Sequence, residues 1–169
     1  MTIAELLVAT IILLLVAGGM TLVISLGSKH LSESVRNSEA AELGSTINAI
    51  LTNEIGYANT VWIDDENKVT GFLSQNYQDP QYRNSLTTDA GGDYGHLIFK
   101  FKEAGTGSNW EVVGEKSYPH GLLAKVDTFL YDPDTAVYTL AVSIGYKGSE
   151  IVRREFSILA VNEPTVERE

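Results

Sequence analysis

The sequence contains no cysteine, only three histidines, and about half as many basic as acidic side chains. The lack of cysteine excludes disulfide frameworks, cysteine nucleophiles and thiolate metal sites. The 12 basic and 22 acidic residues give a net charge of −10. This argues against direct nucleic-acid binding, which needs Lys and Arg to neutralise phosphates. The 169 residues, 44% of them apolar, are enough for one domain with an appended segment.

The motifs that usually carry catalysis are also missing. There is no phosphate-binding glycine loop, no Gly-x-Ser-x-Gly nucleophile turn and no paired-histidine metal motif. His30, His96 and His120 are far apart in the sequence, and we expect them in turns or at the surface. We therefore expect no enzymatic activity, no cofactor and no resident metal.

Three acidic clusters are the remaining candidates for a cation site, because carboxylate oxygens are the ligands that calcium prefers. None has the spacing of a twelve-residue calcium loop, so we interpret them as solvated turns. They are Asp64-Asp65-Glu66, Asp89 with Asp93, and Asp132 with Asp134.

Residues 6–26 form a long apolar run without a charged side chain. A helix of this length spans about 30 Å, which matches the hydrocarbon core of a bilayer. A buried central helix is the alternative, but so small a protein rarely contains one that is uncharged over this length. The run predicts a membrane-spanning helix.

The flanks of this run are unusual. Residues 1–5 contain no Lys or Arg, so they do not form an ordinary secretory signal. The nearest basic residues, Lys29 and His30, lie on the side of the large polar region, whereas basic flanks normally stay in the cytoplasm. A basic leader that has been removed ahead of Met1 would resolve this conflict.

Glu5 lies at the edge of the apolar run, where an unpaired carboxylate costs several kcal/mol. The α-amino group of Met1 is its nearest cation. Between parallel chains staggered along their axes, the amine of one helix can meet Glu5 of the next. That pairing would select a parallel orientation and a fixed axial offset. The alternative is an interfacial Glu5 that reaches the lipid headgroups.

The segment Met1-Thr2-Ile3-Ala4-Glu5-Leu6-Leu7-Val8 resembles the processed N-terminus of type IV pilins and pseudopilins. The resemblance covers about thirty residues. It implies leader removal by a prepilin peptidase, N-methylation of Met1, and subunit contacts through Met1, Thr2 and Glu5. It also implies an assembly ATPase and a platform protein. Before assembly the chain would stay in the cytoplasmic membrane with its head outside. It would then join an extracellular helical filament of the kind that serves adhesion and motility.

One departure from that family concerns the middle of the apolar run. Many pilins have Pro at the position of Leu22, where their helix loosens in the filament, whereas this chain has Gly18-Gly19. Glycine costs about 1 kcal/mol inside a helix, so any melting is expected there. The alternative is that these glycines permit close helix packing.

Helical spacing continues beyond the apolar run. Residues 28–57 contain no proline, and one side carries a stripe of apolar residues that we expect to pack on a sheet. The stripe comprises Leu43, Ile47, Ile50, Leu51 and Ile55. Glu54 projects onto it, and we expect its carboxylate to reach the solvent.

After Tyr57 the pattern changes to the alternation of strands. Short turns at 132–134 and 147–149 favour antiparallel pairing. We expect strands at 61–63, 69–73, 97–102, 122–130, 137–146 and 152–160. A polar loop is expected between 74 and 95, another turn at 105–108, and a loose charged tail at 162–169. Tyr77, Tyr82 and Tyr94 lie in the polar loop, and we expect them to be half-buried rather than part of an adhesive surface.

The sequence thus predicts an α+β protein in which a long N-terminal helix packs on an antiparallel sheet. Its expected parts are a transmembrane or filament-core helix at 1–27, its amphipathic continuation at 28–58 and a β-rich head at 59–169. The expected function is a structural subunit of a pilus-like filament, as a major or a minor pilin. A pseudopilin of a secretion or DNA-uptake system and a single-pass, membrane-anchored binding module are the alternatives.

Overall fold

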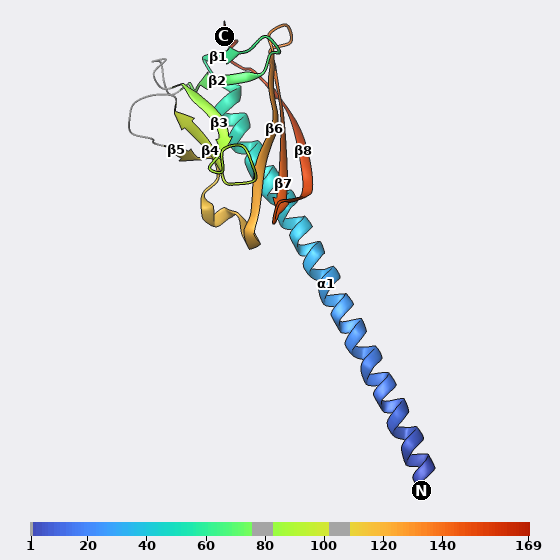
Figure 1. Ribbon diagram of the computed structural model, residues 1–169. Coiled ribbons are helices and arrows are strands. Elements are labelled where there is room, and N and C mark those ends of the chain that lie inside the picture. Colours follow the sequence, from blue (N-terminus) through green and yellow to red (C-terminus); the bar gives the residue numbers. More distant parts are fainter. Residues whose placement is uncertain (1, 76–82, 102–108) are drawn as a thin grey trace. The chain divides into compact units, whose positions relative to one another are not determined.

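The computed structural model describes residues 2–75, 83–101 and 109–169. Contacts divide the chain into two units, Met1–Ser38 and Glu39–Glu169, which are described separately. Figure 1 labels the elements. They are α1 (Ile3–Gly56), β1 (Thr60–Ile63), β2 (Val69–Leu73), β3 (Asn84–Thr88), β4 (Leu97–Phe101), β5 (Asn109–Glu111), the 3-10 turns η2 (Glu115–Ser117) and η3 (Pro119–Gly121), β6 (Leu122–Asp132), β7 (Val137–Tyr146), β8 (Ser149–Leu159) and β9 (Thr165–Arg168).

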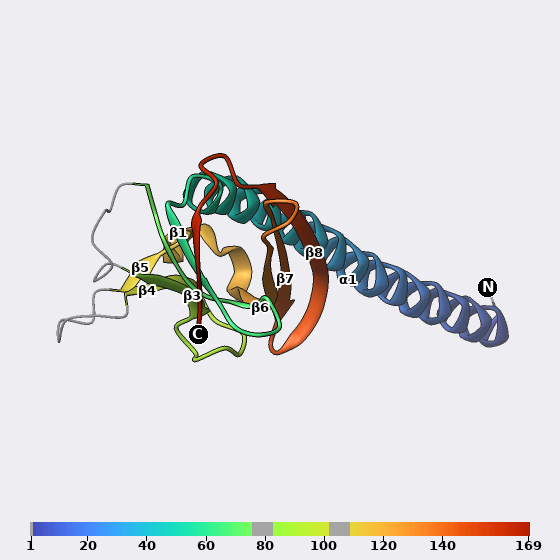
Figure 2. The ribbon, with the colours of Figure 1, turned by 90° about the horizontal axis from the view of Figure 1, so that it is seen from above.

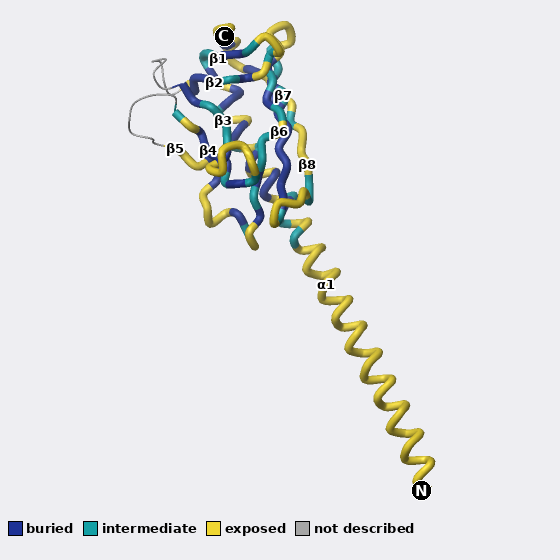
Figure 3. Tube along the Cα trace, viewed as in Figure 1, coloured by how far each residue is buried: buried dark blue, intermediate teal, exposed yellow. Residues whose placement is uncertain are grey.

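The helix α1 has the extent that the sequence predicts, ending one residue before Tyr57. Within the second unit it buries one face, and the predicted stripe is confirmed. Four of the five stripe residues are buried and Ile50 is half-buried against the same core. Figure 3 marks this change from an exposed to a buried helix along α1. Glu54 is half-buried and accepts a hydrogen bond of 2.9 Å from the buried Ser74 hydroxyl.

The strands form two sheets, where the sequence predicted one. The larger sheet has the order β5-β4-β3-β2-β1-β9 and the smaller one the order β6-β7-β8. All pairs are antiparallel, as predicted, except that β9 pairs in parallel with β1. The turns after β6 and β7 connect antiparallel neighbours, which confirms both predicted hairpins. Figure 2 shows the same elements from above, after a 90° turn about the horizontal axis of Figure 1.

Two local predictions were wrong, and one further strand was not predicted. Residues 162–169 are not a loose tail, because Thr165–Arg168 pair with Thr60–Ile63 as β9. The region predicted as a polar loop contains β3, a strand whose residues Asn84–Thr88 are mostly polar and therefore lack apolar alternation. The three-residue β5 is fully exposed, so it has no burial pattern either. Tyr77, Tyr82, Lys102 and the turn predicted at 105–108 lie outside the described residues.

One hydrophobic core joins the helix to both sheets, so the second unit is an α+β structure. Phe72 of β2 contacts Phe99 of β4 and Phe129 of β6 edge to face, with ring centroids 5.6 and 6.3 Å apart. Such edge-to-face contacts are favourable beyond the apolar area that they bury. Phe72 therefore connects the larger sheet to the smaller one.

Tyr138 places a polar hydroxyl in the centre of this core. Its side chain is fully buried, and its hydroxyl has no hydrogen-bond partner among the described residues. Burial raises the pKa of Tyr138 well above its ordinary value. A buried hydroxyl without a partner costs roughly 1–3 kcal/mol. We therefore expect Tyr138→Phe to raise the free energy of unfolding by about 1 kcal/mol in urea titrations.

Tyr118→Phe is the matched control for that substitution. The Tyr118 hydroxyl accepts a buried hydrogen bond of 2.9 Å from the Leu97 amide, so its removal leaves that amide without its partner. We expect this variant to lose about 1–2 kcal/mol. A loss of similar size for Tyr138→Phe would contradict the prediction.

Candidate functional site

The apolar half of α1 is the candidate functional site. Between Glu5 and Lys29 it carries no ionisable side chain. Its most apolar window has a mean hydropathy of 2.7, and none of that window is buried. The large apolar side chains from Leu6 to Leu26 are 52–71% exposed, so every face of the helix presents hydrocarbon. By length and composition, this helix could anchor the protein in a membrane.

Both threonine side chains within this apolar half are satisfied by the helix itself. The Thr10 hydroxyl donates to the carbonyls of Leu6 and Leu7, and the Thr21 hydroxyl donates to that of Ala17. Hydroxyls that bond back to the preceding turn require no water. The two threonines are therefore compatible with hydrocarbon or with an apolar bundle of helices.

Glu5 and Thr2 form a reciprocal cap at the beginning of α1. The Thr2 amide donates to Glu5 Oε2 at 2.7 Å, and the Glu5 amide donates to the Thr2 hydroxyl at 3.3 Å. This is the capping box, which satisfies two amides at the helix N-terminus and places a carboxylate at the positive end of the helix dipole. The Thr-x-x-Glu spacing is visible in the sequence, so this local partner of Glu5 could have been predicted.

The cap changes the argument about the partner of Glu5. Within its own chain the carboxylate already has a donor, so it is not isolated in the way that the sequence analysis assumes. Among the described residues, Oε1 accepts no hydrogen bond. A carboxylate offers about four lone-pair sites. Glu5 can therefore cap its own helix and still accept from a second group. Met1 lies outside the described residues, so its pairing with Glu5 stays a prediction.

The glycines of the apolar half lie in regular helix. Gly18 and Gly19 are helical, and apart from the adjacent residues and the backbone of the helix itself, nothing in the described chain lies within 4 Å of where a Cβ would be. The free faces at these glycines would let another helix approach closely. Melting at Gly18-Gly19 and close packing there both stay predictions, because both concern an assembly of several chains.

The histidines of the chain lie in separate surroundings. His96 contacts Asp89 at 2.9 Å, and His120 contacts Glu39 at 2.8 Å, each through Nδ1. His30 lies 3.8 Å from Glu33 in the first unit, where both side chains are exposed. In the described parts of the chain, no three His, Asp or Glu side chains are grouped so that they could hold a metal ion.

The acidic clusters cap their own turns. Asp64 Oδ1 accepts from the Glu66 and Lys68 amides, and Asp132 Oδ1 accepts from the Asp134 amide. The Thr135 hydroxyl also donates to Asp132, and these bonds lower the pKa of Asp132. These carboxylates therefore have a structural explanation as turn caps.

Four tyrosines of the second unit titrate at higher pH than free tyrosine, namely Tyr94, Tyr118, Tyr131 and Tyr138. Burial is the main cause, and it raises the pKa of Tyr118 to about 12. Tyr94 is half-buried, as the sequence predicts, and burial together with the carboxylates of Glu150 and Asp127 raises its pKa. Burial likewise raises the pKa of Tyr131. These shifts reflect packing of the rings rather than a reactive site.

Comparison of the chain with protein-family models, with curated proteins and with solved structures finds no match.

Proposed function

We propose that this protein is a structural subunit of a type IV pilus-like filament, assembled through the apolar half of α1. The observation that carries the proposal is the arrangement at the beginning of that helix. A single carboxylate, held in a capping box, precedes an uncharged apolar surface long enough to span a membrane. The α+β arrangement of the second unit is consistent with a pilin-like head.

The proposed mechanism is an exchange of contacts. In the cytoplasmic membrane the apolar side chains of residues 6–26 contact lipid, and in the filament they contact the helices of other subunits. Lipid chains and the apolar side chains of neighbouring helices are similarly apolar surroundings for this helix. The exchange therefore has a small free-energy change once a bundle exists. The filament lies outside the cell, and prepilin peptidase, an assembly ATPase and a platform protein act on the chain.

Glu5 sets the axial offset between neighbouring subunits in this mechanism. Its Oε2 accepts from the Thr2 amide of the same chain, and Oε1 accepts from the Met1 amine of a neighbouring subunit. A chain displaced along the bundle axis would leave both charges without partners in an apolar environment, at a cost of several kcal/mol. The two charges therefore select the offset between subunits.

A single-pass, membrane-anchored binding module is the second candidate, and the capping box favours it. Because the Thr2 amide already satisfies Glu5 in one chain, an isolated helix needs no neighbour to stabilise this carboxylate. In that case the apolar half only anchors the second unit at a membrane surface. The two candidates differ in whether the chain is found in sheared surface fibres.

Mass spectrometry of the N-terminal peptide from sheared cell-surface fibres tests the proposal. The expected species begins at Met1, carries an N-methyl group, and is enriched in the fibre fraction relative to whole membranes. Recovery of the chain only in membranes, with an unmethylated N-terminus, would overturn the filament proposal and favour the anchored module.

A further inference from the structure

The strand β9 is attached to the second unit in an unusual way. It pairs in parallel with β1, at one end of the larger sheet, and has no other strand beside it in the described part of the chain. Thr165, Glu167 and Arg168 are exposed and Val166 is half-buried, so the strand adds little to the apolar core. Few buried apolar contacts mean that core packing contributes little to holding β9 in place.

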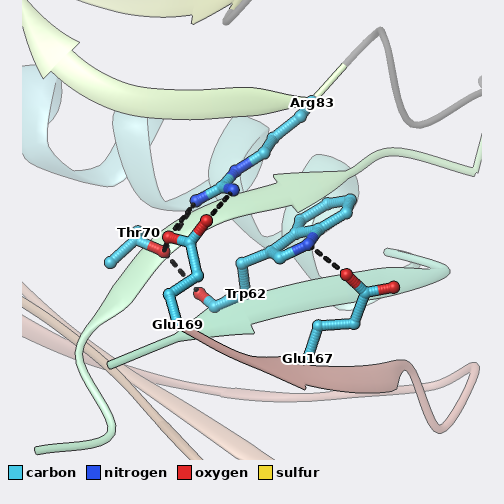
Figure 4. A network of polar contacts seen from close by, with 5 residues as sticks. All are labelled: Trp62, Thr70, Arg83, Glu167 and Glu169. Carbon is cyan, nitrogen blue, oxygen red and sulfur yellow. Dashed lines mark hydrogen bonds and ion pairs between the residues drawn. The ribbon is translucent and has the colours of Figure 1, made fainter. Parts of the chain in front are cut away.

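Polar contacts hold the far end of β9 instead (Figure 4). The Arg83 guanidinium donates to both oxygens of Glu169, from Nη1 at 2.5 Å and from Nη2 at 2.8 Å. The Thr70 hydroxyl also donates to Glu169 at 2.8 Å. Two residues earlier in the chain, Glu167 Oε2 accepts a hydrogen bond of 2.5 Å from Trp62 Nε1.

Arg83 forms a preorganised carboxylate site. Its side chain is only 8% exposed, and its guanidinium lies 4.8 Å from the centre of the Trp62 ring. It also packs directly on Gly71, where a Cβ would come within 2.2 Å of Arg83 Nε. Glycine at this position therefore makes room for the arginine. A buried guanidinium without a partner is strongly destabilising, so this site needs a carboxylate at all times.

The segment that leads into β9 stores strain. Glu163 has φ 44°, a left-handed conformation that costs a residue other than glycine about 1–2 kcal/mol. Opening of the segment after Val161 releases this strain. The weakly buried strand, the strained connection and the buried arginine together define a slot that holds β9 mainly through polar contacts and needs another carboxylate whenever β9 leaves it.

We propose that β9 is an exchangeable strand, and that the slot formed by β1 and Arg83 accepts β9 from a second copy of this chain. The incoming strand would pair with Thr60–Ile63 and place its Glu167 at Trp62 and its Glu169 at Arg83. The occupant is a second copy because the same residues already fit the slot in register within one chain. Exchange of an identical element between protomers introduces few new contacts and is a low-cost route to association.

This exchange is independent of the filament proposal, since every residue involved lies in the unit Glu39–Glu169. In any assembly that crowds the subunits, exchanged strands would link neighbouring heads. The contacts of Arg83 with Glu169 are partly screened, because the Glu169 side chain is 40% exposed. Added salt should therefore accelerate the opening of β9.

Cross-linking of two single-cysteine variants of the full chain tests the exchange, since the chain has no native cysteine. Thr60→Cys and Thr165→Cys chains, whose altered residues are strand partners, are purified separately in detergent. The two are then mixed and treated with a short bis-maleimide. A covalent dimer joining one chain of each kind is expected, at a yield at least several-fold above that of a control mixture. The control replaces Thr165→Cys by Ser157→Cys, at an exposed position of β8.

Two further variants make the outcome decisive. The double variant Thr60→Cys/Thr165→Cys should cross-link within one chain, which shows that the positions react when β9 fills its own slot. If it does so while the mixture gives no more dimer than the control, β9 does not exchange and the proposal is wrong. Glu169→Gln in the donor chain removes the charge that Arg83 binds, and it should lower the dimer yield several-fold. An unchanged yield would show that the carboxylate site does not select the strand.

Discussion

Replacing Glu5 by alanine is expected to abolish the incorporation of this protein into surface fibres while the second unit stays folded. The substitution removes the carboxylate that we propose to pair with a neighbouring Met1 amine, and the amine is then left without a partner in an apolar bundle. A loss of only about 1.4 kcal/mol for each contact lowers an association constant tenfold. Because a filament repeats this contact at each subunit, we expect at least a tenfold lower fibre yield, measured by immunoblotting of sheared fractions.

Two matched variants separate the charge of Glu5 from its role as a helix cap. Glu5→Gln keeps an oxygen that can accept from the Thr2 amide but removes the charge. Thr2→Ala removes the hydroxyl that accepts from the Glu5 amide, at a cost of about 1 kcal/mol to the helix, and keeps the charge. If the charge of Glu5 pairs between subunits, Glu5→Gln fails to assemble. Thr2→Ala keeps that charge, so it assembles at a higher yield than Glu5→Gln, reduced only by the loss of the cap and of the contact that the Thr2 hydroxyl makes with a neighbouring subunit.

The opposite pattern would change the interpretation. Normal fibres from Glu5→Gln, together with poor fibres from Thr2→Ala, would show that the beginning of the helix needs its cap and not a neighbour's amine. A wild-type fibre yield from Glu5→Ala would show that Glu5 does not set the offset between subunits. The anchored module would then be the better account of the apolar helix.

Local sequence patterns were sufficient for the helix and the longest strands. The stripe that includes Leu43, Ile47 and Leu51 has helical spacing, and these residues are buried as a consequence. The alternation in 137–146 predicts β7 over its full length, because every second side chain of that strand faces the core. Such features depend on neighbours within a few residues, and a single sequence contains that information.

Features that depend on distant partners were missed. The segment that forms β9 is charged and shows no alternation of apolar residues, so it resembles a loose tail. Its place in the sheet depends on Trp62 and Arg83, which bind the carboxylates of Glu167 and Glu169 from 105 and 86 residues away. Likewise, the parallel pairing of β9 with β1 depends on where the chain returns after β8, which no local pattern specifies.

The candidate site was only partly predictable for a different reason. The sequence directs attention to Glu5 as a charge at the edge of an apolar run, and the structure adds that Thr2 caps the same residue. The spacing that indicates a capping box was present in the sequence. A carboxylate at the edge of an apolar run looks like an isolated charge unless its place in the first helical turn is also taken into account.

Replacing Ile47 by alanine is expected to produce the largest loss of stability among the conservative variants of the second unit. Ile47 is fully buried on the face of α1 that packs in the core shared by both sheets. Removal of three carbon atoms from such a site costs the lost burial and leaves a cavity, about 2–5 kcal/mol in all. This is a large part of the 5–15 kcal/mol that stabilises a typical domain.

Urea titration of the full chain in detergent, followed by the fluorescence of the buried Trp62, measures this effect. With a typical dependence of about 1–3 kcal/mol per molar urea, we expect the midpoint to fall by about 1–2 M. Thr46→Ala is the matched control, because Thr46 is exposed on the same helix and its hydroxyl bonds only to the carbonyl of Glu42. It should change stability by less than about 0.5 kcal/mol. Equal midpoints for the two variants would mean that the buried stripe of α1 does not hold the helix to the sheets.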